Sequence, residues 1–151
     1  SMTVRLSKEP FAPYDLLLQT EKELDGRRKK IGASSIFIGS MRDFNDGASV
    51  ESMYLEHHPE MTVKELEKIA DRAEKRWSLD HVLVIHRIGE VYPSDPIVLV
   101  AVWSAHRAHS FDACRDIMES LKSNVPFWKR EKREDGERWV TKNTSGSSAD
   151  F

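Results

Sequence analysis

The pattern of hydrophobic and polar positions contains two nearly continuous apolar runs, at residues 82–85 and 97–102. Both are rich in β-branched residues, and runs of this length without alternation are typical of strands buried on both faces. The connection over residues 89–96 contains two prolines and is too short for a helical crossover. The pattern therefore predicts an antiparallel pair of strands.

Periodicity and turn residues predict the other elements of the chain. Residues 2–13 are expected to form an extended arm, and Pro13 is suited to the first turn of the helix that follows. The predicted helices cover residues 14–24, 63–77 and 110–122, and the other predicted strands cover residues 33–39, 50–57 and 138–140.

Two helix starts are predicted from capping residues. Thr62 and Glu65 have the spacing of a capping box, in which the hydroxyl and the carboxylate reach reciprocal backbone N–H groups. Ser110 is a suitable N-cap for the last helix. The predicted apolar stripe of that helix consists of Phe111, Cys114, Ile117, Met118 and Leu121.

The order of the elements favours an α+β fold with a mixed, partly antiparallel sheet. Two strands, a helix, a hairpin and a further helix follow one another along the chain. We expect a single domain over residues 1–143, and the Ser-rich residues 144–151 predict a disordered tail.

Composition narrows the class of protein. The 151 residues are 39% hydrophobic and 32% charged, as in a soluble globular domain. The net charge of −2 provides no general attraction to nucleic acid or to an anionic membrane, so neither is an expected partner. The one cysteine, Cys114, excludes an internal disulfide and a four-cysteine zinc site, and it fits a reducing cytoplasm. Its place on the apolar stripe predicts inert packing.

Several kinds of chemistry have no matching pattern. His106 and His109 have a ligand-like spacing, but no clear third and fourth ligands accompany them, so we predict no metal site. The chain has neither a Gly-rich phosphate loop nor a Gly-x-Ser-x-Gly motif, and no cofactor is predicted. The basic run over residues 27–30 is expected to be a solvated loop, with phosphate or acidic-partner contact as the alternative.

Cations at the ends of the predicted elements are the main chemical signal. Lys122 and Lys129 bracket the turn Val125–Trp128, in which Pro126 ends the preceding helix. If these segments converge, their cleft would bind phosphate or carboxylate, and a crowded lysine would serve as a nucleophile or proton shuttle. The further cations at such boundaries are Arg42, His106, Arg107 and Arg130.

The chain resembles the large, catalytic subunit of molybdopterin synthase over residues 33–140. Five motifs in order carry the resemblance. They are Phe37–Arg42, Leu55–His57, His86–Glu90, Ser104–Arg107 and Leu121–Glu131.

The resemblance implies a fold, a set of partners and a reaction. The fold would be of the α/β-hammerhead type with an added small antiparallel sheet. A homodimer core would bind one small ubiquitin-like subunit at each end, giving a heterotetramer. The C-terminal Gly-Gly tail of that subunit, carried as a thiocarboxylate, would donate sulfur to a cyclic pyranopterin monophosphate, and two transfers would build the dithiolene of molybdopterin.

The resemblance also assigns roles by position. Lys122 and Lys129 match the catalytic lysines of the family. The residues that match substrate-binding positions are Ser40, Met41, Arg42, His106, Arg107, Arg130 and Glu131. Lys142 lies near a further cation of the family, which in some members reaches the neighbouring protomer's site, but its alignment is not secure.

Two alternative functions remain open from the residues alone. The first is a non-enzymatic module that binds an acidic partner or RNA through residues 122–142, which carry seven basic and four acidic side chains. Nucleic-acid surfaces usually have a more one-sided charge. The second is a lysine-dependent lyase that forms a Schiff base with a carbonyl substrate.

Overall fold

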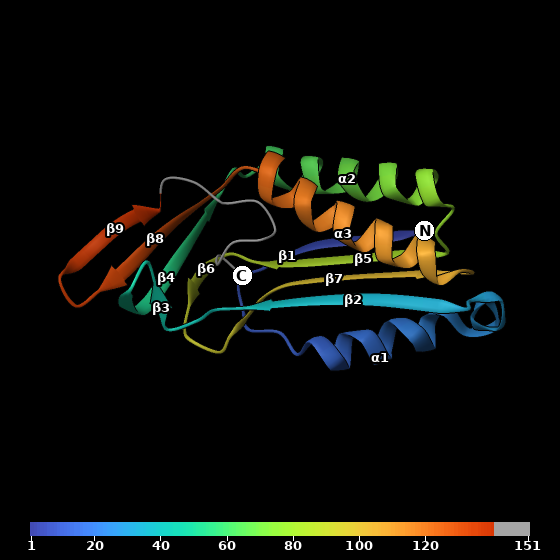
Figure 1. Cartoon of the computed structure of the whole chain (residues 1–151), viewed down its shortest axis with the longest axis horizontal. Helices are drawn as coiled ribbons and strands as arrows, with labels where there is room; N and C mark the ends of the chain where they lie inside the picture. The colour runs from blue at the N-terminus through green and yellow to red at the C-terminus, as the bar shows by residue number, and fades with distance from the viewer. Residues whose placement is uncertain (141–151) are drawn as a thin grey trace.

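The computed structural model describes residues 1–140, which form two sheets and three α-helices (Figure 1). The main sheet has the strand order β1-β5-β7-β2. Strand β1 is parallel to β5, whereas the β5–β7 and β7–β2 pairs are antiparallel, so the sheet is mixed. Its strands are β1 (Met2–Ser7), β5 (His81–Arg87), β7 (Pro96–Ser104) and β2 (Ala33–Ser40).

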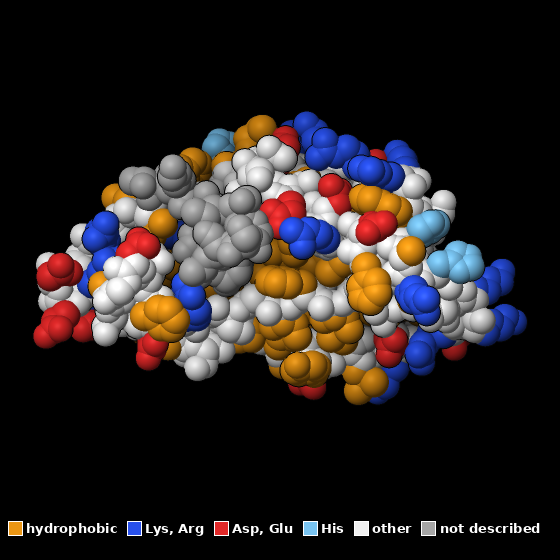
Figure 2. All heavy atoms as spheres, in the orientation of Figure 1, with side chains coloured by type: hydrophobic (Ala, Val, Ile, Leu, Met, Phe, Trp, Pro, Cys, Tyr) orange, Lys and Arg blue, Asp and Glu red, His pale blue; other side chains and the backbone are white. Residues whose placement is uncertain are grey.

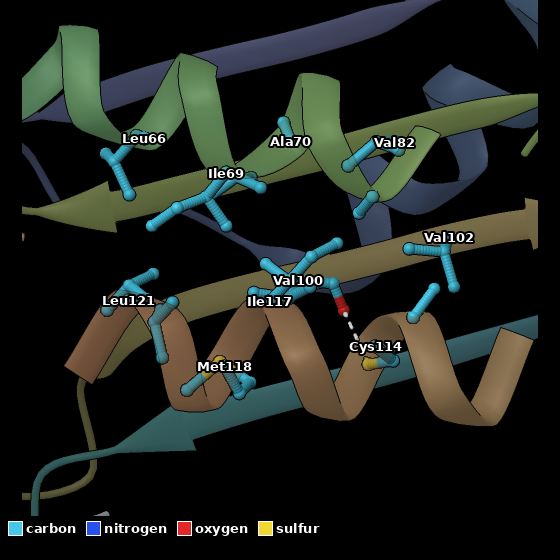
Figure 3. Close-up of a cluster of buried hydrophobic side chains, with 14 of the residues drawn as sticks. Leu66, Ile69, Ala70, Val82, Val100, Val102, Cys114, Ile117, Met118 and Leu121 are labelled. Carbon is cyan, nitrogen blue, oxygen red and sulfur yellow. Dashed lines mark hydrogen bonds between the residues drawn. The ribbon is translucent and has the colours of Figure 1, made fainter. Parts of the chain in front are cut away.

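Helices cover both faces of this sheet, because β5 and β7 are apolar on both sides. Helices α2 (Met61–Trp77) and α3 (Arg107–Asn124) pack on one face, and α1 (Pro13–Leu24) packs on the other (Figure 1). The core under α2 and α3 joins both helices to alternate residues of β5 and β7 (Figure 3). Its labelled members include Leu66, Ile69, Val82, Val100 and Ile117.

A second, antiparallel sheet curls away from one end of the main sheet (Figure 1). Its order is β3-β4-β8-β9, and β6 pairs with β4 as well. A third apolar cluster joins the two sheets, and it contains Met41, Met53 and Ile97. The strands are β3 (Phe44–Asn45), β4 (Ala48–His57), β6 (Gly89–Val91), β8 (Phe127–Arg133) and β9 (Gly136–Val140).

The structure confirms the predicted α+β class, the antiparallel β5–β7 pair and the mixed sheet. All three predicted helices are present, and α1 begins at Pro13 as expected. The extended arm forms a strand, β1, that pairs with β5. The predicted tail over residues 144–151 lies outside the described residues.

The predicted capping box of α2 is wrong. The helix begins at Met61, so Thr62 is already within its first turn. The Thr62 hydroxyl accepts a hydrogen bond from the His58 N–H and donates one to the Pro126 carbonyl. The His58 ring nitrogen Nδ1 accepts the N–H groups of Glu60 and Met61. An imidazole has therefore taken the capping role expected of the hydroxyl.

The predicted start and stripe of α3 also need correction. The helix begins at Arg107 after His106, and the Ser110 hydroxyl donates to the Arg107 carbonyl instead of capping. Phe111 is 67% exposed and so does not belong to the core. Cys114 is buried as predicted, and burial raises the pKa of its thiol to about 11.

The basic run forms a short 3₁₀ helix, η1 (Asp25–Lys30), whose residues are all exposed. The Arg28 guanidinium lies 3.5 Å from the Glu21 carboxylate, and Arg27 donates to the Ser1 hydroxyl. The side chains are thus solvated as predicted, although the backbone is helical. None of the helices formed by residues 1–140 is long and apolar enough to cross a membrane.

Two substitutions on α3 test this packing. Ile117→Ala removes a fully buried side chain and should lower the free energy of unfolding by about 2–5 kcal/mol. Phe111→Ala, on the same helix, should change it by less than about 0.5 kcal/mol, because Phe111 is exposed. Urea denaturation of both variants measures the difference, and equal losses would contradict the packing described here.

Candidate active site at the junction of the two sheets

A small cavity of about 30 Å³ lies where the two sheets meet. We call it the junction pocket. Its lining combines members of the third apolar cluster with charged and polar side chains. The polar lining residues are Ser40, Arg42, Asn45, Lys129 and Glu131.

Strand β8 carries three charged side chains on one buried face. Lys129, Glu131 and Arg133 alternate along the strand, and they are 8%, 3% and 7% exposed. Pairing with β4 places Lys129 opposite Leu55 and Glu131 opposite Met53. Charged residues are seldom buried to this degree unless they are paired, so this row indicates a site in which charge has a role.

Glu131 accepts hydrogen bonds at both carboxylate oxygens. Its Oε1 accepts two from Arg133, from Nε at 2.9 Å and from Nη2 at 2.6 Å. Its Oε2 accepts one from the side-chain amide of Asn45, at 2.9 Å. The guanidinium supplies the opposite charge that a buried carboxylate needs. The carboxylate is therefore held in one orientation beside Lys129.

Arg42 is held over the same pocket by the segment that follows β2. The Met41 N–H donates to the Asp95 carbonyl at 2.9 Å, and the Ser94 N–H donates to the Met41 carbonyl at 2.8 Å. The Arg42 guanidinium lies over the Phe44 ring, 4.5 Å from its centroid. This cation–π contact and the fixed backbone before it limit where the guanidinium can reach.

Lys122 lines a different hollow, a groove of about 510 Å³ between β2 and α3. We call it the Lys122 groove. Ile36 on β2 and Phe111 on α3 are 47% and 67% exposed along it, and Phe37 and Met118 contribute further apolar lining. In Figure 2, hydrophobic side chains gather over β2, and charged side chains lie along α3 above them.

The remaining predicted site residues lie away from the junction pocket. Arg107 begins α3 and Lys122 lies in its last turn, so about 22 Å of helix separates them; His106 precedes Arg107 at the same distant end. Arg130 points away from the Lys129 face of β8, and its guanidinium lies 5.1 Å from the Tyr54 ring centroid and 3.8 Å from Glu137.

One chain thus gathers five of the nine predicted residues around the junction pocket. The five are Ser40, Met41, Arg42, Lys129 and Glu131. The other four are Lys122 in its groove, His106 and Arg107 at the start of α3, and Arg130 on the opposite face of β8. Lys142 lies outside the described residues. Within residues 1–140 no group of three or more His, Cys, Asp or Glu is arranged to hold a metal.

Sequence reasoning missed His86, which is buried beneath β8. Its ring stacks on Phe127 at 3.9 Å between centroids, and its Nδ1 lies 2.7 Å from the Arg87 carbonyl oxygen. Burial, together with the smaller effect of the positive charge of Lys129, lowers the pKa of His86 to about 4, although the hydrogen bond with the Arg87 carbonyl acts in the opposite direction. The imidazole is therefore neutral near pH 7 and packs beside Lys129 as an uncharged ring.

Asn45 and Arg133 were also missed. The Asp46-Gly47 pair that follows Asn45 is a typical hairpin turn, and Lys129, Glu131 and Arg133 repeat at the two-residue spacing of one strand face. These two signals could have indicated a pocket-facing loop and a strand with one charged face.

Comparison with known proteins identifies the family. Residues 6–124 match the model of the family described as MoaE protein. A "Molybdopterin synthase catalytic subunit" of Pseudomonas aeruginosa is 44% identical over 148 residues, which cover 98% of this chain and 96% of that protein. Another from Ralstonia nicotianae is 55% identical over 113 residues, which cover 75% of this chain but only 64% of that relative.

A solved structure agrees with these matches. The molybdopterin biosynthesis MoaE protein from Burkholderia ambifaria superposes with a TM-score of 0.77 at 40% identity, covering 97% of this chain and 95% of that one. The fold and the matches define the class as an enzyme subunit of molybdenum cofactor biosynthesis. The chain belongs to the MoaE family, the catalytic subunits of molybdopterin synthase.

This membership confirms the resemblance inferred from the five motifs and favours an enzyme over the RNA-binding alternative. The structure agrees on physical grounds. Lys129 and Arg133 are buried, and Arg133 is paired with Glu131, so two of the seven basic side chains of the C-terminal segment are withdrawn from the surface that a nucleic acid would contact.

The buried neutral His86 predicts a pH dependence of stability. Its pKa falls from 6.5 in the unfolded chain to about 4 in the folded one, so between these values only the unfolded chain binds the proton. The free energy of unfolding should therefore decrease by about 3 kcal/mol as the pH falls from 6.5 to 4. Urea titrations across this range should show that His86→Gln loses this part of the slope.

His109→Gln is the matched control, because His109 is exposed. It should keep the pH slope of the unmodified chain. A slope that is equally steep in His86→Gln would show that His86 is not the group responsible.

Proposed function

We propose that the chain transfers sulfur from the C-terminal thiocarboxylate of a small ubiquitin-like subunit to a cyclic pyranopterin monophosphate, in two rounds, to give molybdopterin. The observation that carries the proposal is the buried Lys129 beside Arg42 in the junction pocket of a MoaE family member. A buried ammonium and a nearby guanidinium favour an anionic guest.

The junction pocket would bind one end of the pterin. At about 30 Å³ it has room for a small polar group and not for the whole ring system. Arg42 would hold the phosphate through its planar guanidinium. Lys129 would orient or protonate the pterin oxygen that leaves during sulfur transfer. Ser40, Met41 and Glu131 would line the pocket around the bound group.

The Lys122 groove would receive the tail of the small subunit. Among the described residues β2 pairs with β7 alone, so its other side is an open strand edge along the groove. An extended peptide can add to such an edge through main-chain hydrogen bonds. A Gly-Gly end would fit closely against β2, and Lys122 would polarise the thiocarboxylate carbonyl and be placed to attack it.

His106 and Arg107 would serve the partner protomer in a homodimer. About 22 Å of helix separates Arg107 from Lys122, so one chain cannot bring both to one substrate. A second copy can present its own His106 and Arg107 to the pocket, where they would hold phosphate or the tail carboxylate. Arg130, on strand β8 of the second sheet, would bind an anionic group of the substrate after its contact with Glu137 is released.

Lys122→Ala and Lys129→Ala test the catalytic assignment. Each should lower product formation by about 10²–10⁴-fold, because each removes a group that polarises or protonates the reacting atoms. The assay mixes the full chain with a thiocarboxylated small subunit and the pyranopterin monophosphate, and it measures the dithiolene product.

Lys132→Ala is the matched control, because Lys132 is an exposed lysine on the opposite face of β8. It should keep full activity. Circular dichroism and co-purification with the small subunit should be unchanged in all three variants. Loss of folding in parallel with loss of activity would refute the catalytic roles.

Mixed dimers test whether the pocket is shared between protomers. One protomer carries Lys122→Ala, and its partner carries His106→Ala with Arg107→Ala. If His106 and Arg107 act across the interface, the mixed dimer has one complete site and about half of the normal activity, whereas both parent homodimers are inactive. A mixed dimer as inactive as its parents would show that Lys122, His106 and Arg107 act within one chain.

A further inference from the structure

The hydrogen bonds around Glu131 link two segments that carry different parts of the proposed site. Asn45 belongs to the β3–β4 hairpin next to Arg42, and Arg133 ends the strand that carries Lys129. Both donate to the same carboxylate. We call these three residues the Glu131 cluster.

We infer that Asn45 and Arg133 are positioning residues that act through Glu131 to hold Arg42 at a fixed distance from Lys129. The inference rests on the proposed function, because it assumes that Arg42 and Lys129 contact the substrate. It assigns a role to two residues outside the motifs that identify the family.

The hairpin presents Asn45 in a defined place. Asp46 and Gly47 have φ values of 49° and 75°, so both central residues of the turn are left-handed, as in a type I′ hairpin. Asn45 pairs with Ala48 next to this turn, and the Val50 N–H donates to the Asp43 carbonyl at 2.8 Å. The backbone on the C-terminal side of Arg42 is therefore well determined.

The segment that carries Arg42 is anchored at both ends. On one side, Met41 exchanges two backbone hydrogen bonds with the turn that contains Ser94 and Asp95. On the other, the Asn45 amide donates to Glu131 across a sequence separation of 86 residues. This second contact is a side-chain link between the segment and β8, and it adds to the backbone pairing of β3 with β4 and of β4 with β8. Without it, the position of Arg42 relative to Lys129 would be less well determined.

Arg133 determines where the Glu131 carboxylate points. Two guanidinium nitrogens donate to the one oxygen Oε1, which leaves Oε2 directed to Asn45. A lysine at this position would keep the charge but lose the paired donors. Arg133 does not line the junction pocket, so its effect on the substrate must pass through Glu131.

The test uses Asn45→Ala, Arg133→Lys and the double variant in the reconstituted full-chain enzyme. Steady-state rates at varied pyranopterin monophosphate give kcat and KM separately. Each single variant should lower kcat/KM about tenfold, mainly by raising KM, because a misplaced Arg42 weakens substrate binding. The double variant should lose little more than either single variant, because both changes release the same carboxylate.

Two controls keep the result specific. Lys132→Ala changes the neighbour of Arg133 on the exposed face and should leave kcat/KM unchanged. Arg133→Lys keeps the positive charge beside Glu131, and Asn45→Ala removes no charge, so thermal unfolding should show that both variants remain folded.

The outcomes separate this inference from the proposed function. Unchanged KM with lower thermal stability would show a structural role only and overturn the inference, as would fully additive effects, which mean independent contacts. Neither result would contradict the proposal that the unmodified chain transfers sulfur. An unmodified chain that makes no product would overturn the proposed function, and the inference with it.

Discussion

The burial of β5 and β7 on both faces is the constraint on which the rest of the structure depends. Residues 81–87 of β5 are all buried, and β7 is buried from Ile97 to Ser104. Each fully buried aliphatic side chain contributes about 1.5–3 kcal/mol, so this pair strongly favours cover on both sides. Helices α2 and α3 pack on one face of the main sheet, and α1 packs on the other.

The middle of this pair, residues 82–85 and 97–103, is apolar throughout, so polar chemistry is left to the ends and edges of the main sheet. Charged groups therefore lie at its ends and edges: at the junction with the second sheet, along the edge strand β2, and at the start of α3. The second sheet adds buried charge next to the main sheet, because pairing of β8 with β4 buries one face of a strongly charged strand. His86, near the end of β5, stacks on Phe127, at the start of β8, and so joins the two regions.

Local patterns predicted the central strands and the helices, because long apolar runs and helical periodicity depend on neighbours in the sequence. The same patterns could not place Thr62, because His58 and Pro126 take up its hydroxyl. Residues 129–133 look like a solvated charged segment until β4, far away in the chain, pairs with them. The predicted helix over residues 110–122, in contrast, already separates Lys122 from the cations that precede the helix, and it could have indicated a shared site from the start.

The central claim is that cations from separate segments, and from two protomers, surround one anionic guest. A crystal structure of the dimer with the pyranopterin monophosphate bound tests it most directly. The account predicts that Arg42 and Lys129 of one protomer, and His106 and Arg107 of its partner, lie within about 3 Å of polar atoms of the same molecule. A bound molecule that does not touch Lys129, or that touches residues of one protomer only, would contradict the account.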